Sequence, residues 1–292
     1  MINCFICNSG MILNLKTNYN CCISCGHQTL NSSIQTYMVN DVHEINEIKK
    51  TTNLDKFKSA VLDKYEFNTK EKILLDIGSA SGRFLFKNLT RYKQAIGIEV
   101  TPESIEFSQC VLKLNIVQSI AEVNIPVNTV TAWHSLEHIP SHQLEDLLTS
   151  IVKKLAKEAR FYVSIPNSNS RQCEFFKTKW AFYDPPNHVH QFTPDSIELL
   201  MARYGFKVEC YIESKPYNIF GWIQGILNMI IPFKNYLYCR LKRKNIKKTY
   251  LLDILNIILL SFAVPVGKIL ELLDKNNIKK QGVITICFQV VN

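Results

Sequence analysis

The chain has 292 residues, 47% of them hydrophobic, and a formal net charge of +9 at pH 7. This composition excludes an intrinsically disordered chain, and the length suffices for one sizeable domain with an appendage. The positive charge favours an anionic partner, such as nucleic acid, a phosphorylated substrate or a membrane surface. Ten cysteines spread over this length do not indicate a disulfide scaffold.

Two Cys-x-x-Cys pairs lie close together near the start, namely Cys4 with Cys7 and Cys22 with Cys25. Each pair can present two thiolates to one side, and four thiolates form a closed tetrahedral zinc site. We therefore predict a zinc ribbon over residues 1–40 that holds a structural Zn²⁺ ion and depends on it for folding. Cys21 and His27 are substitute ligands, and four unrelated free thiols are the alternative interpretation.

The first residues, Met1-Ile2-Asn3-Cys4, have neither the basic nor the apolar region of a secretory signal. We therefore expect a reducing, cytoplasmic setting, where paired cysteines more often bind metal. The next segment, 41–70, is expected to link the ribbon to the main domain. Its residues 41–65 are polar with scattered apolar side chains and without Gly or Pro, which predicts a helix.

Strands and helices alternate from Lys72 to Pro166 at the spacing of an α/β domain. The predicted strands are Ile73–Ile77, Ala95–Val100, Asn115–Gln118, Thr129–Trp133 and Arg160–Ile165. The predicted helices are Gly82–Tyr92, Pro102–Leu114, Ser141–Lys157 and Pro194–Tyr204, the last with Thr193 as its N-cap. Another strand begins at Gly205, and Gly282–Val291 forms a final strand. This order assigns 71–215 and 282–292 to one α/β domain.

A glycine-rich turn joins the first of these strands to its helix, over Asp76-Ile77-Gly78-Ser79-Ala80-Ser81-Gly82. Glycines allow a ligand to approach the backbone, and the free N–H groups of a helix start favour an electron-rich group. Glu99 ends the next strand, where an acid can accept hydrogen bonds from both hydroxyls of a ribose. The two features together predict a nucleotide-containing ligand.

Residues 216–281 form an insert before the last strand. An uncharged run over 217–233 is followed by a basic block and then by a second apolar run over 254–267. The basic residues of the block are Lys234, Arg240, Lys242, Arg243, Lys244, Lys247 and Lys248. Neither run reaches the ~20 apolar residues of a spanning helix. The insert is therefore predicted to be helical and to contact an anionic membrane surface peripherally through 217–270, with a soluble lid or a dimer interface as alternatives.

From Lys70 to Lys215 the sequence resembles the class I S-adenosylmethionine-dependent methyltransferases. The turn Asp76–Gly82 is similar to their first motif and Glu99 to their ribose ligand, and Trp133-His134-Ser135-Leu136-Glu137-His138-Ile139 resembles the segment after their fourth strand. Pro186-Asn187-His188-Val189-His190-Gln191-Phe192-Thr193 resembles a run in a bacterial subgroup that modifies glycans and small molecules. The resemblance implies a Rossmann-like, seven-stranded sheet with an antiparallel last strand. It also implies that the helix before the domain closes over the cofactor, and a solvated packing helix is the alternative.

The resemblance further implies S-adenosyl-L-methionine as cofactor. Its expected contacts are Asp76, Gly78, Ser79, Gly82, Glu99, Ser119, Ile120, Trp133 and His134. Three histidines compete as general base for a hydroxyl acceptor. His188 is the first choice, His190 the alternative, and His138 is expected to shape the cofactor pocket.

The best-supported hypothesis is a cytoplasmic methyltransferase, peripheral at the inner face of the membrane. It is expected to O-methylate a sugar, a glycan precursor or a related small molecule, with lipid- and nucleotide-linked acceptors both considered. A zinc-ribbon rRNA methyltransferase is the main alternative, because ribbon and charge both suit RNA. Nucleic acid is less favoured because the charge gathers in the insert rather than on the ribbon, and because no Asn/Asp-Pro-Pro-aromatic run follows the fourth strand. A non-catalytic binding module is the third interpretation. It is disfavoured by the intact Asp76, Gly78, Gly82 and Glu99.

Overall fold

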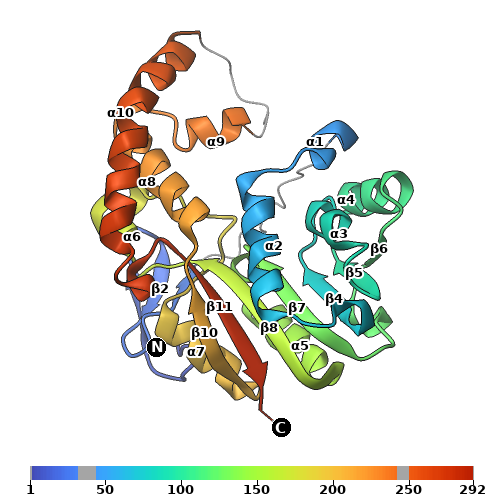
Figure 1. Cartoon of the computed structure of the whole chain (residues 1–292). Helices are drawn as coiled ribbons and strands as arrows, with labels where there is room; N and C mark the ends of the chain where they lie inside the picture. Colours follow the sequence, from blue (N-terminus) through green and yellow to red (C-terminus); the bar gives the residue numbers. More distant parts are fainter. Residues whose placement is uncertain (1, 32–43, 242–249, 292) are drawn as a thin grey trace.

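A seven-stranded sheet organises the computed structural model, which describes residues 2–31, 44–241 and 250–291 (Figure 1). In spatial order its strands are β10 (Phe206–Ile212), β11 (Val283–Val290), β8 (Leu155–Pro166), β7 (Val127–Trp133), β4 (Ile73–Ile77), β5 (Gln94–Ile98) and β6 (Asn115–Val117). Strand β11 is antiparallel to both of its neighbours, whereas the other neighbouring pairs are parallel. The predicted Rossmann-like sheet with an antiparallel last strand is confirmed.

Helices cover both faces of the sheet because its central strands are apolar on both sides. The covering helices are α2 (Asn53–Tyr65), α3 (Arg83–Asn88) and α4 (Pro102–Glu106) on one face, and α5 (Ser141–Val152) and α7 (Pro194–Arg203) on the other. Leu74 packs in one cluster with Leu85 of α3, and its neighbour Leu75 packs in the other with Leu148 of α5. All five residues of β4 are buried, so this strand is the centre of the core.

Three predicted helices are several residues longer than those observed. The helix expected over Gly82–Tyr92 is observed only over Arg83–Asn88. The helix expected over Pro102–Leu114 is interrupted, because α4 passes into a π-helical turn at Phe107–Val111. The helix expected over Ser141–Lys157 ends at Val152, and β8 begins five residues earlier than predicted, at Leu155. Leu155 pairs with Val127 of β7, so pairing between strands replaces the local preference for helix.

The N-terminal residues form a small sheet that the main domain completes. Strands β1 (Met11–Asn14), β2 (Tyr19–Cys22) and β3 (Gln28–Leu30) are antiparallel, and β9 (His190–Gln191) pairs with β3. The ribbon is therefore joined through its sheet to a loop more than 150 residues further along the chain. Residues 32–40 of the predicted ribbon lie outside the described residues.

The link to the main domain contains two helices rather than the single predicted one. Helix α1 (Ile45–Lys49) ends before Thr52, whose side chain begins α2 in a capping box with Asp55. Asp55 also pairs with Arg83 at the start of α3, with 2.7 Å between nitrogen and oxygen. These contacts fix α2 over the end of the sheet where the glycine-rich turn lies (Figure 1).

Three helices, α8 (Lys215–Ile230), α9 (Tyr236–Leu241) and α10 (Tyr250–Asp274), form an arm that rises above the sheet (Figure 1). Helix α10 packs closely along α8. A Cβ atom added to Gly267 of α10 would lie only 2.8 Å from Cγ1 of Ile223 in α8, so the contact leaves no room for a side chain there. Helix α10 runs unbroken through Pro265 and is long and apolar enough to cross a membrane. The predicted apolar run 254–267 is thus part of a longer helix. Basic residues 242–248 lie outside the described residues.

Candidate functional site

The glycine-rich turn has the backbone geometry that the sequence predicts for a ligand loop. Gly78 and Gly82 have positive φ values of 68° and 76°. A Cβ on Gly78 would lie 2.6 Å from Ser135 Cβ, and one on Gly82 would lie 2.4 Å from Leu114 Cδ1. Only glycine fits these positions, because it accepts a positive φ and needs no room for a side chain. The hydroxyl of Ser79 is buried and accepts or donates no hydrogen bond among the described residues.

Glu99 holds the turn from the end of β5. One carboxylate oxygen accepts a hydrogen bond from the Ala80 N–H at 2.8 Å, and the other accepts from the Val100 and Thr101 N–H groups at 2.9 Å. The carboxylate is buried beside the turn, and one acceptor position, on the oxygen that binds Ala80, remains for a further donor. Its position fits the predicted role, although it also has a structural role that the sequence did not reveal.

Asp76 lies at the end of β4, beneath the turn. Its Oδ1 accepts a hydrogen bond from Thr131 Oγ1 at 2.6 Å. Complete burial raises the pKa of Asp76 to about 7, against the effects of Thr131 and of the Lys58 cation. A cationic ligand group bound above it would favour the ionised form.

The remaining predicted cofactor residues lie along the same edge of the sheet, at the carboxyl ends of β6 and β7. Ser119 caps a short turn in which Ile120 is buried. Trp133 packs against Phe84 of α3, with Lys58 Nζ 5.2 Å from the centre of its ring. The ring of His134 lies 4.5 Å from that of Tyr217, the third residue of α8. Neither Tyr217 nor Lys58 could be assigned to the site from the sequence, because both contacts depend on how distant elements pack.

A carboxylate and two histidines meet next to this edge. Glu137 and His138 lie in the turn after β7, and the loop before β9 brings His188 to them, with 4.8 Å between the two imidazole centres. Burial would raise the pKa of Glu137, but His134, His138 and His188 lower it to about 2. Burial and His138 lower the pKa of His188 to about 4. Glu137 was not among the predicted site residues, although it precedes His138 directly.

His190 contacts the ribbon through one of its ring nitrogens. Its Nδ1 lies 3.1 Å from Nε2 of His27, and burial lowers the pKa of His190 to about 4. The Tyr19 hydroxyl donates a 2.6 Å hydrogen bond to the carbonyl of His188. Among the described residues, the ribbon therefore supports the loop that carries both histidines.

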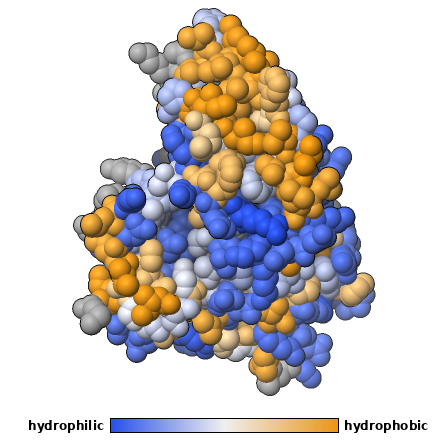
Figure 2. Space-filling view, turned by 90° about the vertical axis from the view of Figure 1, so that its left-hand side faces the viewer, coloured by the Kyte–Doolittle hydropathy of each residue, from blue (hydrophilic) through white to orange (hydrophobic). Residues whose placement is uncertain are grey.

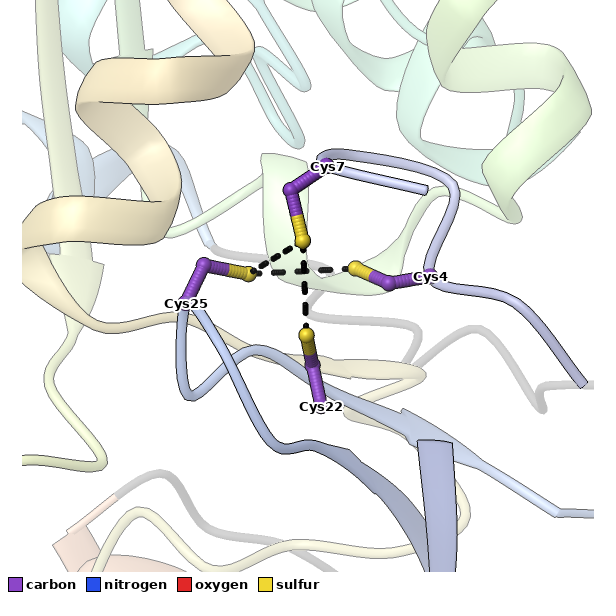
Figure 3. A group of neighbouring side chains, drawn as sticks. All are labelled: Cys4, Cys7, Cys22 and Cys25. Atoms are coloured by element: carbon purple, nitrogen blue, oxygen red, sulfur yellow. Dashed lines mark hydrogen bonds between the residues drawn. The ribbon is translucent and has the colours of Figure 1, made fainter. Parts of the chain in front are cut away.

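The four predicted cysteines converge to one point (Figure 3). Cys7 Sγ lies 3.4 Å from Cys22 Sγ and 3.5 Å from Cys25 Sγ, and Cys4 Sγ lies 3.8 Å from Cys25 Sγ. Four sulfur atoms around a tetrahedral zinc ion are ~3.8 Å apart, given Zn–S distances of ~2.3 Å. The arrangement therefore fits a closed zinc site.

The two substitute ligands are not part of this cysteine group. Cys21 Sγ is directed to the carbonyl of Tyr19, and His27 Nδ1 lies 3.8 Å from Cys4 Sγ. His27 thus stands beside the four sulfur atoms rather than among them.

Comparison with known proteins agrees with this geometry. A family model described as "Methyltransferase domain" matches residues 50–211. A search of curated proteins found no match. The cyclopropane synthase MmaA2 from Mycobacterium tuberculosis aligns with a TM-score of 0.51 at 12% identity, over 88% of this chain and 90% of that one.

Two further solved structures are similar. A putative sarcosine dimethylglycine methyltransferase from Galdieria sulphuraria aligns with a TM-score of 0.50 at 9% identity, over 86% of this chain and 93% of that one. The [4+2]-cyclase SpnF has a TM-score of 0.50 at 11% identity, and the alignment covers 88% of each chain. At such low identities these similarities establish the fold alone.

Proposed function

The chain belongs to the class I S-adenosylmethionine-dependent methyltransferases, and we propose that it O-methylates a hydroxyl of a sugar or glycan precursor. Asp76, Gly78, Ser79, Gly82 and Glu99 would hold the cofactor. Glu99 would bind its ribose, and Asp76 would lie nearest to its cationic groups. Ser119, Ile120, Trp133 and His134 would line the remaining cofactor contacts.

The observation that carries the acceptor proposal is the polar group formed by Glu137, His138 and His188. It adjoins the cofactor turn, because Ser135, two residues before Glu137, lies against Gly78. Methyl transfer to a hydroxyl requires alignment of the oxygen with the sulfonium methyl group and removal of the hydroxyl proton. His188 is the proposed base, with Glu137 stabilising the positive charge that forms. Nδ1 of His190 contacts His27, and Nδ1 of His138 lies against the carbonyl of Asn187. We therefore prefer His188 to both as the general base.

The test begins with calorimetric titration of the protein with S-adenosylhomocysteine, followed by mass-spectrometric detection of methyl transfer to nucleotide sugars, lipid-linked glycans and rRNA. We expect micromolar binding and transfer to a hydroxylated sugar. His188→Ala should reduce turnover by about 10²-fold or more, whereas the exposed His142→Ala should not. Transfer to rRNA alone would contradict the acceptor proposal, and absence of binding would contradict the function.

We further propose that Zn²⁺ bound by Cys4, Cys7, Cys22 and Cys25 has a structural role. Four protein ligands leave no open position for chemistry. The ribbon's last strand pairs with β9, which supports a role in positioning the loop of His188. Metal analysis of wild type and of the Cys4→Ser/Cys22→Ser variant checks this proposal. An unchanged zinc content in the variant would refute it.

We also propose that the arm contacts a membrane peripherally, at the cytoplasmic face of that membrane. Large exposed apolar side chains recur every three or four residues along one side of α10 (Figure 2). They include Leu251, Ile254, Ile258, Phe262, Val266, Ile269 and Leu273. The other side buries polar groups within the protein, since Asp274 accepts a hydrogen bond from Trp222 and pairs with Arg171. A helix with one side bound in this way suits a position in the membrane surface better than one across the bilayer.

Sedimentation with vesicles of neutral and of anionic lipid tests this contact. Phe262 is 67% exposed and Leu15, on the ribbon, is 87% exposed, so a charge at either position leaves the core intact. Phe262→Glu should weaken vesicle binding several-fold, and Leu15→Glu should not. Equal binding by both variants and wild type, or no binding by wild type, would remove the membrane from the proposal.

A further inference from the structure

Glu137, His138 and His188 have the composition and spacing of a metal site distinct from the cysteine cluster. One ligand atom from each residue lies within 4.8 Å of the others. We propose that these three residues bind a divalent transition-metal cation beside the cofactor turn. The proposal deepens the proposed function and rests on it for the role of the cation, but the site itself is argued from the side chains alone.

The polar atoms of this group are incompletely satisfied. Glu137 is only 1% exposed, and His134 Nδ1 lies 3.3 Å from its Oε1. Among the described residues its Oε2 has no hydrogen-bond partner. Nδ1 of His188, whose residue is 8% exposed, also has no hydrogen-bond partner in the described part of the chain. Buried carboxylates are normally paired, hydrogen-bonded or bound to metal, so a cation here would satisfy the group.

The position of His138 also suits a metal ligand. Its Nδ1 lies 2.8 Å from the carbonyl oxygen of Asn187. A carbonyl only accepts hydrogen bonds, so Nδ1 carries a proton, and in the neutral imidazole Nε2 then carries the free lone pair. Metal-binding histidines typically donate their second N–H to a carbonyl or carboxylate, which fixes the ring and its tautomer. Asn187 also precedes His188, so the same loop orients one ligand and supplies the next.

The ligand set indicates the class of cation. Two imidazoles and one carboxylate suit Zn²⁺, Fe²⁺ or Mn²⁺, and three protein ligands leave positions open for a substrate. A hydroxyl bound at an open position would become more acidic and would lose its proton to a solvent water. Its oxygen would then be able to attack the sulfonium methyl carbon. The O–C bond would form as the C–S bond breaks, and the electron pair of the C–S bond would remain on sulfur as a neutral thioether. With the cation bound, His188 acts as its ligand; in the metal-free site it is the free base of the proposed function.

The experiment measures metal content rather than activity. The full-length protein is equilibrated with zinc, dialysed and analysed for zinc per chain, alongside Glu137→Gln, His188→Ala and the matched control His142→Ala on the exposed face of α5. We expect two zinc ions per chain in wild type and in His142→Ala, and one in the other two variants. One ion in wild type, or two in Glu137→Gln and His188→Ala, would overturn the site.

Cobalt substitution and cofactor binding separate the remaining outcomes. Cobalt bound to the cysteines gives a thiolate charge-transfer band, and its retention in Glu137→Gln and His188→Ala shows that the ribbon is folded. Titration with S-adenosylhomocysteine is performed on the same samples. Cofactor binding with one metal ion per chain would overturn the cation site and leave the methyltransferase function standing. Two metal ions without cofactor binding would leave the site standing and contradict the function.

Discussion

Glu99 allows a quantitative test of the cofactor site. Three backbone N–H groups already occupy its carboxylate, so one acceptor position on Oε2 is left for a ribose hydroxyl, and a hydrogen bond to a charged group contributes ~1.5–3 kcal/mol. Glu99→Gln keeps the size of the side chain but loses the charge and one acceptor oxygen. Loss of one such bond corresponds to ~10- to 100-fold weaker binding of S-adenosylhomocysteine by calorimetry.

The same carboxylate binds the N–H groups of Ala80, Val100 and Thr101, so weaker binding alone could reflect a disturbed turn. An analogue of S-adenosylhomocysteine that lacks the 2′-hydroxyl separates the two effects in a double-mutant cycle. If Glu99 binds the ribose, removal of the hydroxyl should weaken binding to wild type much more than to Glu99→Gln. Equal losses in both proteins would refute the ribose contact, even if Glu99→Gln binds weakly.

Three further predictions concern the turn, its aspartate and the ribbon. Gly78→Ala should weaken binding of S-adenosylhomocysteine by at least ~10-fold, because Gly78 has a positive φ and a Cβ there would collide with Ser135. The control Gly10→Ala should not weaken binding, because the space around Gly10 is open. The pKa of Asp76 is raised to about 7, so the folded protein retains a proton that the unfolded chain releases near its ordinary pKa of 3.8. The free energy of unfolding of wild type, measured with urea, should therefore fall relative to that of Asp76→Asn as the pH rises from ~4 to ~7, by on the order of 2–4 kcal/mol. A difference in free energy that stays constant over this range would contradict the raised pKa. Tyr19→Phe, which removes the hydrogen bond to the His188 carbonyl, should cost ~1 kcal/mol in the same assay, while Tyr250→Phe, 90% exposed, should cost nothing measurable.

The parts of the fold that could be predicted from sequence are those with local causes. Strand β4 was predicted with its observed bounds, because an unbroken apolar run leads directly into the Asp76–Gly82 turn. The cysteine cluster followed from spacing alone. The early start of β8 could not be predicted in this way, because Lys157 and Glu158 resemble a helix surface until pairing with β7 is known.

The candidate site was predictable only in part for the same reason. Its cofactor side lies at the carboxyl ends of β4, β5, β6 and β7, which follow one another along the chain and are neighbours in the sheet, so the order of motifs in the sequence already predicts that they meet. Its acceptor side combines the turn after β7 with a loop some fifty residues later, and only packing reveals that Glu137 faces His188. The pairing of β3 with β9 joins residues still further apart, and neither short strand carries a signal of its partner.

The three accessory parts of the chain meet the sheet at this one edge. The ribbon supports the His188 loop through Tyr19, the arm brings Tyr217 against His134, and α2 places Lys58 over Trp133. The cofactor turn, by contrast, is built wholly from the α/β core that this fold shares with other proteins. Recognition of the acceptor should therefore depend on parts that the core does not supply. Shortened chains that retain only the core would be poor material for identifying the substrate, even where they still bind the cofactor.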